Sequence, residues 1–252
     1  LDFFKFTSKI APENLKFIGT KGYIKRKCLK LIEKYKKKKS FYVEKKDNNK
    51  VSFFNNDFLS ESYDDNLFVE GHFETEEYFK KYANDIEHEF TFKNLDLFKK
   101  NPLYSEIKNS ESVSICIRQH RFSERLRNTS KKDKENSDIF TKDQINYIKK
   151  GINIIRSKVS NPKFYLWSND LNNLDQFFPS NKYTPVFNKT VDLDLFLMTQ
   201  AKHFITIPST YNWWGAWLAK NQNKIIIRPS DSSFSNFKIN NKDFWPKPWI
   251  EV

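Results

Sequence analysis

Short apolar runs alternate with helical patterns over the second half of the chain. Four runs are apolar enough to form buried strands, at residues 112–118, 164–167, 203–207 and 224–227. Apolar residues between these runs recur at helical spacing, which predicts helices over 141–159, up to 178, over 193–202 and over 209–219. This order of elements favours an α/β fold with a parallel sheet and helices on its faces.

Polar residues predict where the longest of these helices begins. Residues 128–138 are almost wholly polar and indicate a loop. Residues 141–144, Thr-Lys-Asp-Gln, read as a capping box. From Ile145 to Val159 the apolar residues fall on one face, so we predict that the helix begins at Thr141.

The first half of the chain has a weaker pattern. It predicts a helix over 23–35, strands over 41–43, 51–54 and 67–71, a polar turn at 47–49 and a helix that begins at Thr75. Residues 93–111 are polar and contain Asn101-Pro102, so we place a domain boundary there. The expected domains are an N-terminal domain at 1–105 and a C-terminal domain at 106–252.

Positive charge is concentrated near the N-terminus. The net charge is +13, and residues 1–50 hold 16 Lys and Arg against five Asp and Glu. A basic face around residues 36–39 fits two interpretations: contact with an anionic membrane or a lipid-linked acceptor, or a solvated surface in a Lys-rich protein. Nucleic acid is not an expected partner, because no recognition motif is present and the aromatic residues lie in apolar patterns.

No targeting signal is recognisable in the sequence. No apolar run approaches the length of a membrane-spanning helix, and the first residues do not form a signal peptide. Cys28 and Cys116 lie far apart and read as reduced thiols. These features predict a cytoplasmic protein, with peripheral contact on the inner face of the membrane as an option through the basic residues 1–50.

Three polar turns follow strands that a parallel sheet would align. They lie at residues 118–121, 168–170 and 209–210. In such sheets, ligands bind beyond the carboxyl ends of the strands. A guanidinium suits a pyrophosphate, a carboxylate suits base or ribose hydrogens, and a helix N-terminus suits phosphate oxygens. Together the turns predict a site for a nucleoside diphosphate.

Residues 194–218 carry a specific signature around Trp213-Trp214. Here Asp-x-x-Leu-Met-x-x-x-Lys-His-x-Ile precedes Ser-Thr-Tyr-Asn-Trp-Trp-Gly-Ala-Trp-Leu. This resembles the C-terminal signature of glycosyltransferase family 11, the α1,2-fucosyltransferases that use GDP-fucose, which usually reads Asn-Ser-Ser-Phe-Ser-Trp-Trp at this point. Residues 71–79, Gly-His-Phe-Glu-Thr-Glu-Glu-Tyr-Phe, are similar to a second family segment, Gly-Tyr-x-Gln-Ser-Glu-x-Tyr-Phe.

The resemblance covers about residues 65–252 and implies a GT-B-like architecture. Its C-terminal domain would be a Rossmann-type domain that binds the nucleotide sugar. The family's Gly-x-x-Gly-Asn-Gln turn has no counterpart in this sequence. The resemblance therefore implies an incomplete N-terminal α/β domain on the acceptor side.

The first polar turn matches the family motif His-x-Arg-Arg-Gly-Asp-Tyr. Residues 116–122 read Cys-Ile-Arg-Gln-His-Arg-Phe at this place. The resemblance implies that Arg118 contacts the GDP phosphates and stabilises the charge on the departing GDP. Gln119 replaces the second Arg, so Arg121 or His120 would supply the missing positive charge. Glu124 would replace the lost carboxylate.

The other two turns receive donor-binding roles from the same resemblance. Residues 164–170 match Phe-x-x-Phe-Ser-Asp-Asp, which implies that Asp170 accepts hydrogen bonds from guanine. A helix cap is the alternative reading of Asp170. Ser209 and Thr210 would contact phosphate, whereas Trp213-Trp214 fits core packing better than sugar contact.

The catalytic base stays open at this point. Glu124, Glu74 and His120 are all candidates to take the proton of the acceptor hydroxyl. His72 and Glu74 are the acceptor-side candidates. The formal Asp-x-Asp at 192–194 precedes a helical run, so we interpret it as a helix cap rather than a metal motif.

The resemblance implies transfer of fucose from GDP-fucose to a galactoside hydroxyl, with inversion and an α1,2 linkage, in the synthesis of a bacterial surface glycan. The expected partners are GDP-fucose and an oligosaccharide or lipid-linked glycan acceptor. We expect no metal and no cofactor besides the donor, because the four His lack metal-ligand spacing. Two alternatives are a non-catalytic glycan- or nucleotide-binding relative and a transferase for another GDP-deoxyhexose.

Overall fold

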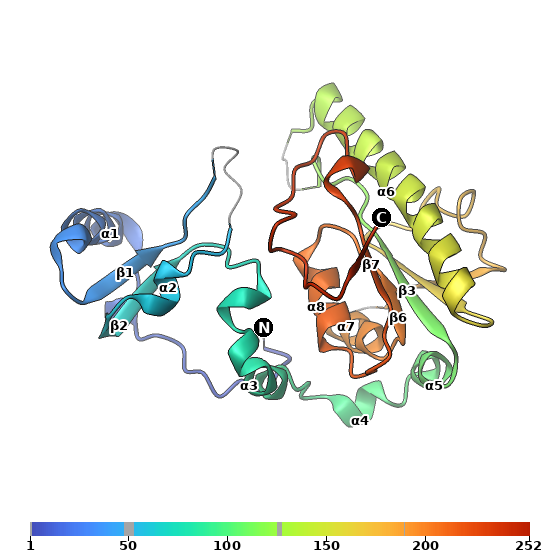
Figure 1. Ribbon diagram of the computed structural model, residues 1–252, viewed down its shortest axis with the longest axis horizontal. Helices are drawn as coiled ribbons and strands as arrows, with labels where there is room; N and C mark the ends of the chain where they lie inside the picture. Colours follow the sequence, from blue (N-terminus) through green and yellow to red (C-terminus); the bar gives the residue numbers. More distant parts are fainter. Residues whose placement is uncertain (1, 48–52, 125–127, 189) are drawn as a thin grey trace. The chain divides into compact units, whose positions relative to one another are not determined.

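The computed structural model describes residues 2–47, 53–124, 128–188 and 190–252, and it divides the chain into two compact units (Figure 1). The sheet unit contains Leu1–Phe4, Phe92–Asn241 and Trp245–Val252, and the ribbon unit contains Lys5–Thr91 and Lys242–Phe244. The main change between the units therefore falls at residues 91–92, upstream of the boundary that the sequence placed at 105.

The sheet unit is built on a six-stranded parallel sheet in the order β5-β4-β3-β6-β7-β8. Its strands are β3 (Ser112–Ile117), β4 (Lys163–Ser168), β5 (Tyr183–Val186), β6 (His203–Ile205), β7 (Ile226–Arg228) and β8 (Ile250–Glu251). Counted along the chain from β3, this order is 3-2-1-4-5-6, the Rossmann order that reverses between the first and fourth strands. The expected Rossmann-type parallel sheet is confirmed.

Helices cover the two faces of this sheet (Figure 1). The long helix α6 (Lys131–Lys158) packs on β3 and β6 from one side, and α7 (Val191–Thr199) and α8 (Thr210–Leu218) lie on the other. A Cβ on Gly215 of α8 would lie 2.3 Å from the Met198 sulfur, so this glycine allows α8 to approach α7 closely. Trp213 is buried at the same place, as expected for core packing.

Helix α6 begins ten residues before the start that the sequence predicted. The loop predicted for residues 128–138 is confirmed only for 128–130, because 131–138 belong to α6, and the capping box predicted at Thr141 is wrong. Ser130 caps the helix instead, in a reciprocal capping box with Asp133. The polar residues of the first turns lie on the solvent side, while Ser137 and Phe140 are buried, so a polar composition here conceals an amphipathic helix.

Other parts of the sheet unit also differ from the prediction. The chain between β4 and β5 contains turns rather than a helix ending at 178, and β5 and β8 were not predicted. The stretch 93–111, read as a polar boundary, contains α4 (Leu95–Phe98) and α5 (Pro102–Asn109). Helix α5 starts where Asn101 accepts a hydrogen bond from the Leu103 N–H at 2.9 Å, with Pro102 in the first helical position.

The ribbon unit contains a parallel pair of strands, β1 (Lys39–Val43) and β2 (Tyr63–Glu70). The other elements of the unit are α1 (Gly19–Ile32), α2 (Asp57–Ser60), α3 (Ala83–Glu89) and the 3-10 turns η1 (Glu13–Leu15), η2 (Glu33–Tyr35), η3 (Glu76–Tyr78) and η4 (Lys80–Tyr82). The predicted helix at 23–35 and strands at 41–43 and 67–71 correspond to α1, β1 and β2. Thr75 caps η3 by accepting from the Glu77 N–H, whereas the sequence predicted a longer helix there.

The predicted strand at 51–54 is not present in its described part. Phe53 and Phe54 belong to no strand, while Val51 and Ser52 lie outside the described residues. Asn48 and Asn49 of the predicted polar turn lie outside them as well. Strand β1 pairs in parallel with β2 instead.

Two further expectations concern cysteines and membrane spans. Cys28 is exposed and Cys116 is buried, and both are free thiols. Among the described residues, no helix combines the length and the apolar character that crossing a bilayer requires.

Candidate nucleotide-sugar site

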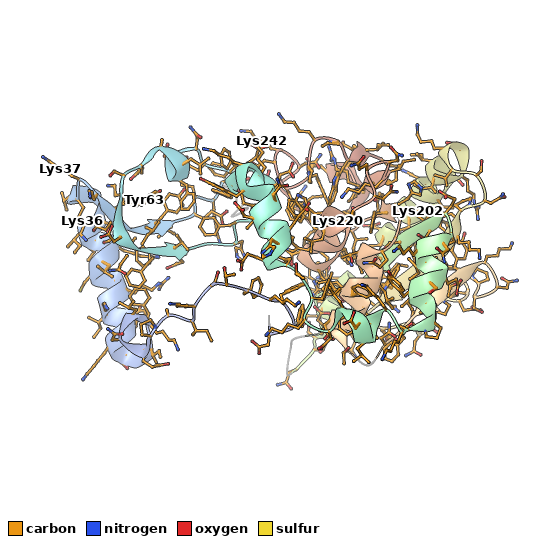
Figure 2. All side chains as sticks on the ribbon, turned by 90° about the horizontal axis from the view of Figure 1, so that it is seen from below. Lys36, Lys37, Tyr63, Lys202, Lys220 and Lys242 are labelled. Carbon is orange, nitrogen blue, oxygen red and sulfur yellow. The ribbon has the colours of Figure 1, made fainter. Side chains whose placement is uncertain are left out.

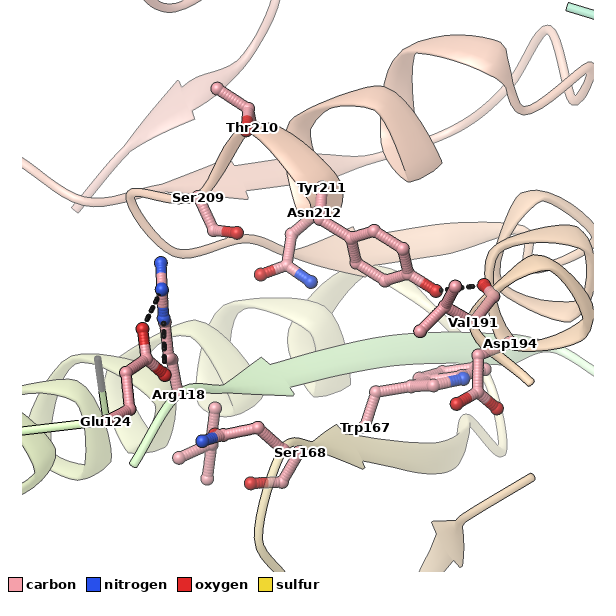
Figure 3. Close-up of a pocket in the computed structure, with 12 residues that line it drawn as sticks. Arg118, Glu124, Trp167, Ser168, Val191, Asp194, Ser209, Thr210, Tyr211 and Asn212 are labelled. Atoms are coloured by element: carbon pink, nitrogen blue, oxygen red, sulfur yellow. Dashed lines mark hydrogen bonds and ion pairs between the residues drawn. The ribbon is translucent and has the colours of Figure 1, made fainter. Parts of the chain in front are cut away.

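A cavity of about 370 Å³ opens at the carboxyl edge of the sheet, where the strand order reverses between β3 and β6 (Figure 3). Residues from the ends of β3 and β4, the start of α7 and the first turn of α8 surround it. They are Ile117, Arg118, Glu124, Trp167, Ser168, Asn169, Val191, Asp194, Ser209, Thr210, Tyr211 and Asn212. In open α/β sheets this reversal point is where ligands bind.

Arg118 directly follows β3 and forms an ion pair with Glu124 (Figure 3). Both side chains remain partly exposed, at 25% and 20%. We call this part of the cavity the charged side. The Arg118 guanidinium presents a fork of N–H donors that matches two oxygens of a carboxylate or a phosphate equally well. An anionic ligand and Glu124 would therefore compete for Arg118.

The backbone of Arg118 is fixed by Gln144 of α6. The Arg118 N–H donates to Gln144 Oε1 at 2.9 Å, and Gln144 Nε2 donates back to the Arg118 carbonyl at 2.9 Å. Gln144 is fully buried, so it cannot exchange these bonds for water. This amide clamp sets the direction in which the Arg118 side chain leaves the strand.

The loop after Arg118 is held on two sides. Gln119 donates its N–H to Asn169 Oδ1 at 2.8 Å, and Asn169 Nδ2 donates to the Gln119 carbonyl at 3.0 Å. On the α6 side, Ser137 Oγ accepts from the Phe122 N–H at 3.1 Å. Ser137 belongs to the first turns of α6, in the stretch read as a loop from the sequence. The turns after β3 and β4 are thereby locked together.

The first turn of α8 forms another wall of the cavity. Ser209 occupies the N-cap position, but its side chain makes no capping hydrogen bond. The N–H groups of a first helical turn lack intrahelical partners and carry partial positive charge. Asn212 is only 7% exposed, lines the cavity, and has no hydrogen-bond partner for its amide among the described residues. The amide is therefore available to hydrogen-bond a ligand in the cavity.

Across the cavity from Arg118, Figure 3 shows Asp194 near Trp167 and Val191. We call this part, with Trp167, Asp194 and Tyr211, the sheltered side. Asp194 Oδ1 accepts from Asn188 Nδ2 at 2.6 Å, and burial raises the pKa of its carboxyl. The Tyr211 hydroxyl donates to the Val191 carbonyl at 2.7 Å, which ties the first turn of α8 to the first turn of α7.

A second cavity of about 550 Å³ adjoins the first and shares Glu124 and Asn169 with it. Asp170 and His120 line this second cavity, and their side chains lie 2.9 Å apart. The Asn172 N–H and then His120 lower the pKa of Asp170. His120 has a φ of 56°, in the left-handed region, which turns the chain sharply after β3.

The structure brings most of the expected donor-site residues together. Arg118, Ser209 and Thr210 line the first cavity, His120 and Asp170 line the second, and Glu124 lines both. Arg121 instead lies over the Phe237 ring at 4.2 Å and over Phe140 at 5.6 Å, and it lines neither cavity. The binding and catalytic roles of all these residues stay predictions.

His72 and Glu74, the acceptor-side candidates, belong to the ribbon unit. Both side chains are exposed. The His72 N–H donates to Glu44 Oε2 at 2.7 Å in the turn after β2. Gly71 is needed at this turn, because a Cβ there would lie 2.4 Å from the Glu44 Cβ.

Sequence reasoning missed Asp194, Asn212 and Gln144. It assigned the Asp-x-Asp at 192–194 to a helix cap, but the N-cap of α7 is Thr190, and Asp194 faces the cavity. The sequence feature that could have identified Asp194 is its place in the first turn of a helix, directly before the apolar residues 195–198. No group of three or more His, Cys, Asp or Glu with metal-binding geometry occurs among the described residues.

Comparison with known proteins identifies the family of this chain. The model of the family described as "Glycosyl transferase family 11" matches residues 21–252. An "Alpha-1,2-colitosyltransferase" of Escherichia coli is 27% identical over 187 residues, which cover 72% of this chain and 61% of that protein. The "O-antigen biosynthesis glycosyltransferase WbnK" of Escherichia coli is 32% identical over 89 residues, which cover 34% of this chain and 30% of that protein.

The chain matches about three fifths of the length of the colitosyltransferase and less of WbnK. The match to the family model, by contrast, includes the whole six-stranded sheet and every residue of both cavities. It bears out the resemblance read from the Trp213-Trp214 signature, and this chain belongs to glycosyl transferase family 11.

Proposed function

We propose that this chain transfers a deoxyhexose from a GDP-linked donor to a galactoside hydroxyl of a bacterial surface glycan. Fucose from GDP-fucose is the first candidate, with inversion and an α1,2 linkage. Colitose is the second candidate, because one relative is an α1,2-colitosyltransferase. The other relative acts in O-antigen biosynthesis, which supports an O-antigen oligosaccharide or its lipid-linked form as the acceptor.

The observation that carries the proposal is the arrangement of the cavity at the reversal point of the sheet. Arg118 and the first turn of α8 lie on its walls, and both suit the oxygens of a diphosphate. On donor binding, Arg118 would exchange the Glu124 carboxylate for phosphate oxygens. The Asn212 amide would donate to the same phosphates or to the ribose between them and the base.

The sheltered side suits the nucleoside. Guanine offers two adjacent N–H donors on one edge, and a carboxylate such as Asp194 can accept both. Trp167 and Tyr211 supply the apolar and aromatic surface that a base needs. Asp170, the residue first proposed for guanine, is the competing candidate from the second cavity. Exchange of each carboxylate for its amide distinguishes the two.

The transfer step needs charge stabilisation and a proton acceptor. The acceptor hydroxyl oxygen attacks the anomeric carbon, the bond to the β-phosphate oxygen breaks, and GDP leaves with the electron pair. Arg118 and the α8 terminus would stabilise the charge that builds on GDP. Glu124, once released from Arg118, would take the hydroxyl proton; His120, held by Asp170, and Glu74 are the other candidates.

Product formation and donor binding test the proposal separately. Purified protein is incubated with GDP-fucose or GDP-colitose and a panel of galactosides, with and without EDTA, and products are detected by mass spectrometry. We expect an α1,2-linked product that EDTA does not abolish. Binding of GDP without turnover of either donor would favour the non-catalytic relative, for which the changed motif at 116–122 is the specific reason.

A further inference from the structure

Helix α1 of the ribbon unit turns an apolar stripe towards solvent. Ile24 is 55% exposed and Leu31 is 67% exposed, and the exposed Cys28 lies between them. These positions are spaced by four and three residues, so they fall on one side of the helix. Tyr35, which follows α1 in η2, is 79% exposed. The only buried residue within the helix is Gly22.

The opposite side of α1 anchors the helix to the rest of the ribbon unit. At Gly22, a Cβ would lie 2.4 Å from the Phe17 carbonyl carbon, so the helix and the preceding chain are in close contact. Arg26 Nε and Lys30 Nζ donate to Glu70 of β2 at 2.6 and 2.9 Å. The Arg26 guanidinium lowers the pKa of Glu70 to about 2. The exposed stripe is therefore a fixed outer face of the unit.

Positive charge surrounds this stripe. Residues 19–39 contain ten Lys and Arg and a single acidic residue, Glu33. Glu33 is buried and accepts hydrogen bonds from Ser40, so it does not itself form part of the exposed surface. Lys21 and Lys27 are exposed beside the stripe. Figure 2 shows Lys36 and Lys37 by the C-terminal end of α1.

We propose that this α1 surface, formed by Ile24, Cys28, Leu31 and the lysines around them, binds the interface of an anionic lipid membrane. Apolar side chains on one face of a cationic helix enter the boundary between headgroups and acyl chains, while Lys side chains extend to the lipid phosphates. Neither contribution alone gives stable attachment, and α1 presents both on one face. The helix would lie in the plane of the membrane.

The charge distribution favours a lipid surface over a second copy of this chain. An isologous contact through the α1 surface would place the lysines of one copy against those of the other. Like charges brought together at an interface are unfavourable. An anionic bilayer neutralises the same lysines and also accepts the apolar stripe.

Vesicle sedimentation tests the proposal on the unaltered protein. It is mixed with vesicles of phosphatidylcholine alone or with one third phosphatidylglycerol, at low and at moderate salt. We expect binding only to the vesicles with phosphatidylglycerol, weakened at least about threefold when ionic strength rises from 0.05 to 0.3 M. Equal binding to both vesicle types, or no binding to either, would overturn the proposal.

Paired variants separate the apolar and the cationic contributions. Ile24→Ser with Leu31→Ser removes the stripe, and Lys21→Gln with Lys27→Gln removes two flanking charges. We expect each pair to weaken vesicle binding about fivefold or more. The control, Ile139→Ser with Lys142→Gln, makes the same kinds of change at exposed residues of α6 and should leave binding unchanged. Melting temperatures verify that each variant is folded.

Self-association of the chain through the α1 surface is the outcome that would contradict membrane binding. Sedimentation-velocity runs at increasing protein concentration are compared for the unaltered chain and the two α1 pairs. A concentration-dependent dimer that only the α1 pairs dissolve, together with vesicle binding that they do not change, would assign the α1 surface to a second copy. A monomer under all conditions supports the membrane assignment.

Discussion

The charged side and the sheltered side of the cavity place carboxylates in different electrostatic surroundings. On the charged side, Glu124 pairs with Arg118 and both remain partly exposed to solvent. On the sheltered side, Asp194 receives a neutral amide hydrogen bond from Asn188, and burial raises the pKa of its carboxyl. One carboxylate is neutralised by an adjacent charge, whereas the other pays a desolvation cost that a ligand donor could relieve.

This difference suggests how one cavity distinguishes the two ends of a nucleotide. A partly exposed ion pair can open at modest cost, because exposed ion pairs contribute little to stability. It can therefore exchange partners when a phosphate arrives. A sheltered carboxylate discriminates strongly, because leaving it without the right donors is expensive. The charged side would supply affinity for any diphosphate, and the sheltered side would select the base.

Removal of Arg118 should give the largest effect. Arg118→Ala deletes the charged hydrogen bonds to phosphate, so we expect the Kd for GDP to rise about 100-fold and transfer to fall at least as much. Arg118→Lys keeps the charge without the fork and should recover only part of the loss. Calorimetry with GDP and with UDP is the measurement. We expect similar losses of affinity for GDP and for UDP, because both carry the diphosphate. Unchanged GDP affinity would show that Arg118 does not contact the nucleotide.

Exchange of Asp194 should change base preference rather than overall affinity. An amide offers one acceptor and one donor, which suits adenine better than guanine. In Asp194→Asn we therefore expect the preference for GDP over ADP to fall about 20-fold. Asp170→Asn is the matched control from the second cavity and should leave the preference intact. The reverse pattern would return the guanine contact to Asp170.

The strand ends were predictable because they lie beside continuous apolar runs. Ser112–Ile117 is buried along its whole length, so its end and the following Arg118 could be located from the sequence. The signature around Trp213-Trp214 located α8 in the same way. Strand β5 was missed because Pro185 and a polar neighbour interrupt its pattern at the edge of the sheet.

Tertiary contacts determine the parts of the site that the sequence did not reveal. Gln144 lies more than three turns inside α6, and its role depends on the strand that ends beside it. The polar first turns of α6 read as a loop because only Ser137 and Phe140 face inwards there. Asn212 and Asp194 line one cavity because α7 and α8 meet there in the folded chain. Spacing along the chain carries none of this information.

The raised pKa of Asp194 also predicts the sign of a pH effect on stability. The folded protein retains a proton on this carboxyl at a pH where the unfolded chain has lost it. The free energy of unfolding should therefore contain a contribution that falls as pH rises from the unfolded pKa, about 4, through the folded pKa. Asp194→Asn removes this contribution. Urea denaturation of both proteins across this range should show that the unaltered protein loses stability relative to Asp194→Asn as pH rises.

A substitution of Asn212 tests the wall of the cavity that the first turn of α8 forms. Its amide has no partner in the unliganded cavity, so Asn212→Ala removes one neutral hydrogen bond to the donor without breaking an existing one. We expect GDP affinity to fall about fivefold and thermal stability to remain within error. Asn221→Ala is a control at an amide that already bonds within the protein, to the Lys202 carbonyl at 3.0 Å. That variant should lose stability and keep GDP affinity.

Glu124 should give the smallest change in binding, and in the opposite direction. In Glu124→Gln, a phosphate no longer competes with a carboxylate for Arg118 and no longer faces its negative charge. We expect the Kd for GDP to fall about threefold, because a partly exposed ion pair costs little to open. If Glu124 also takes the acceptor proton, turnover should fall about 100-fold while GDP binds more tightly. Tighter binding with unchanged turnover would leave His120 or Glu74 as the base, and weaker binding would show that Glu124 supports Arg118 rather than competing for it.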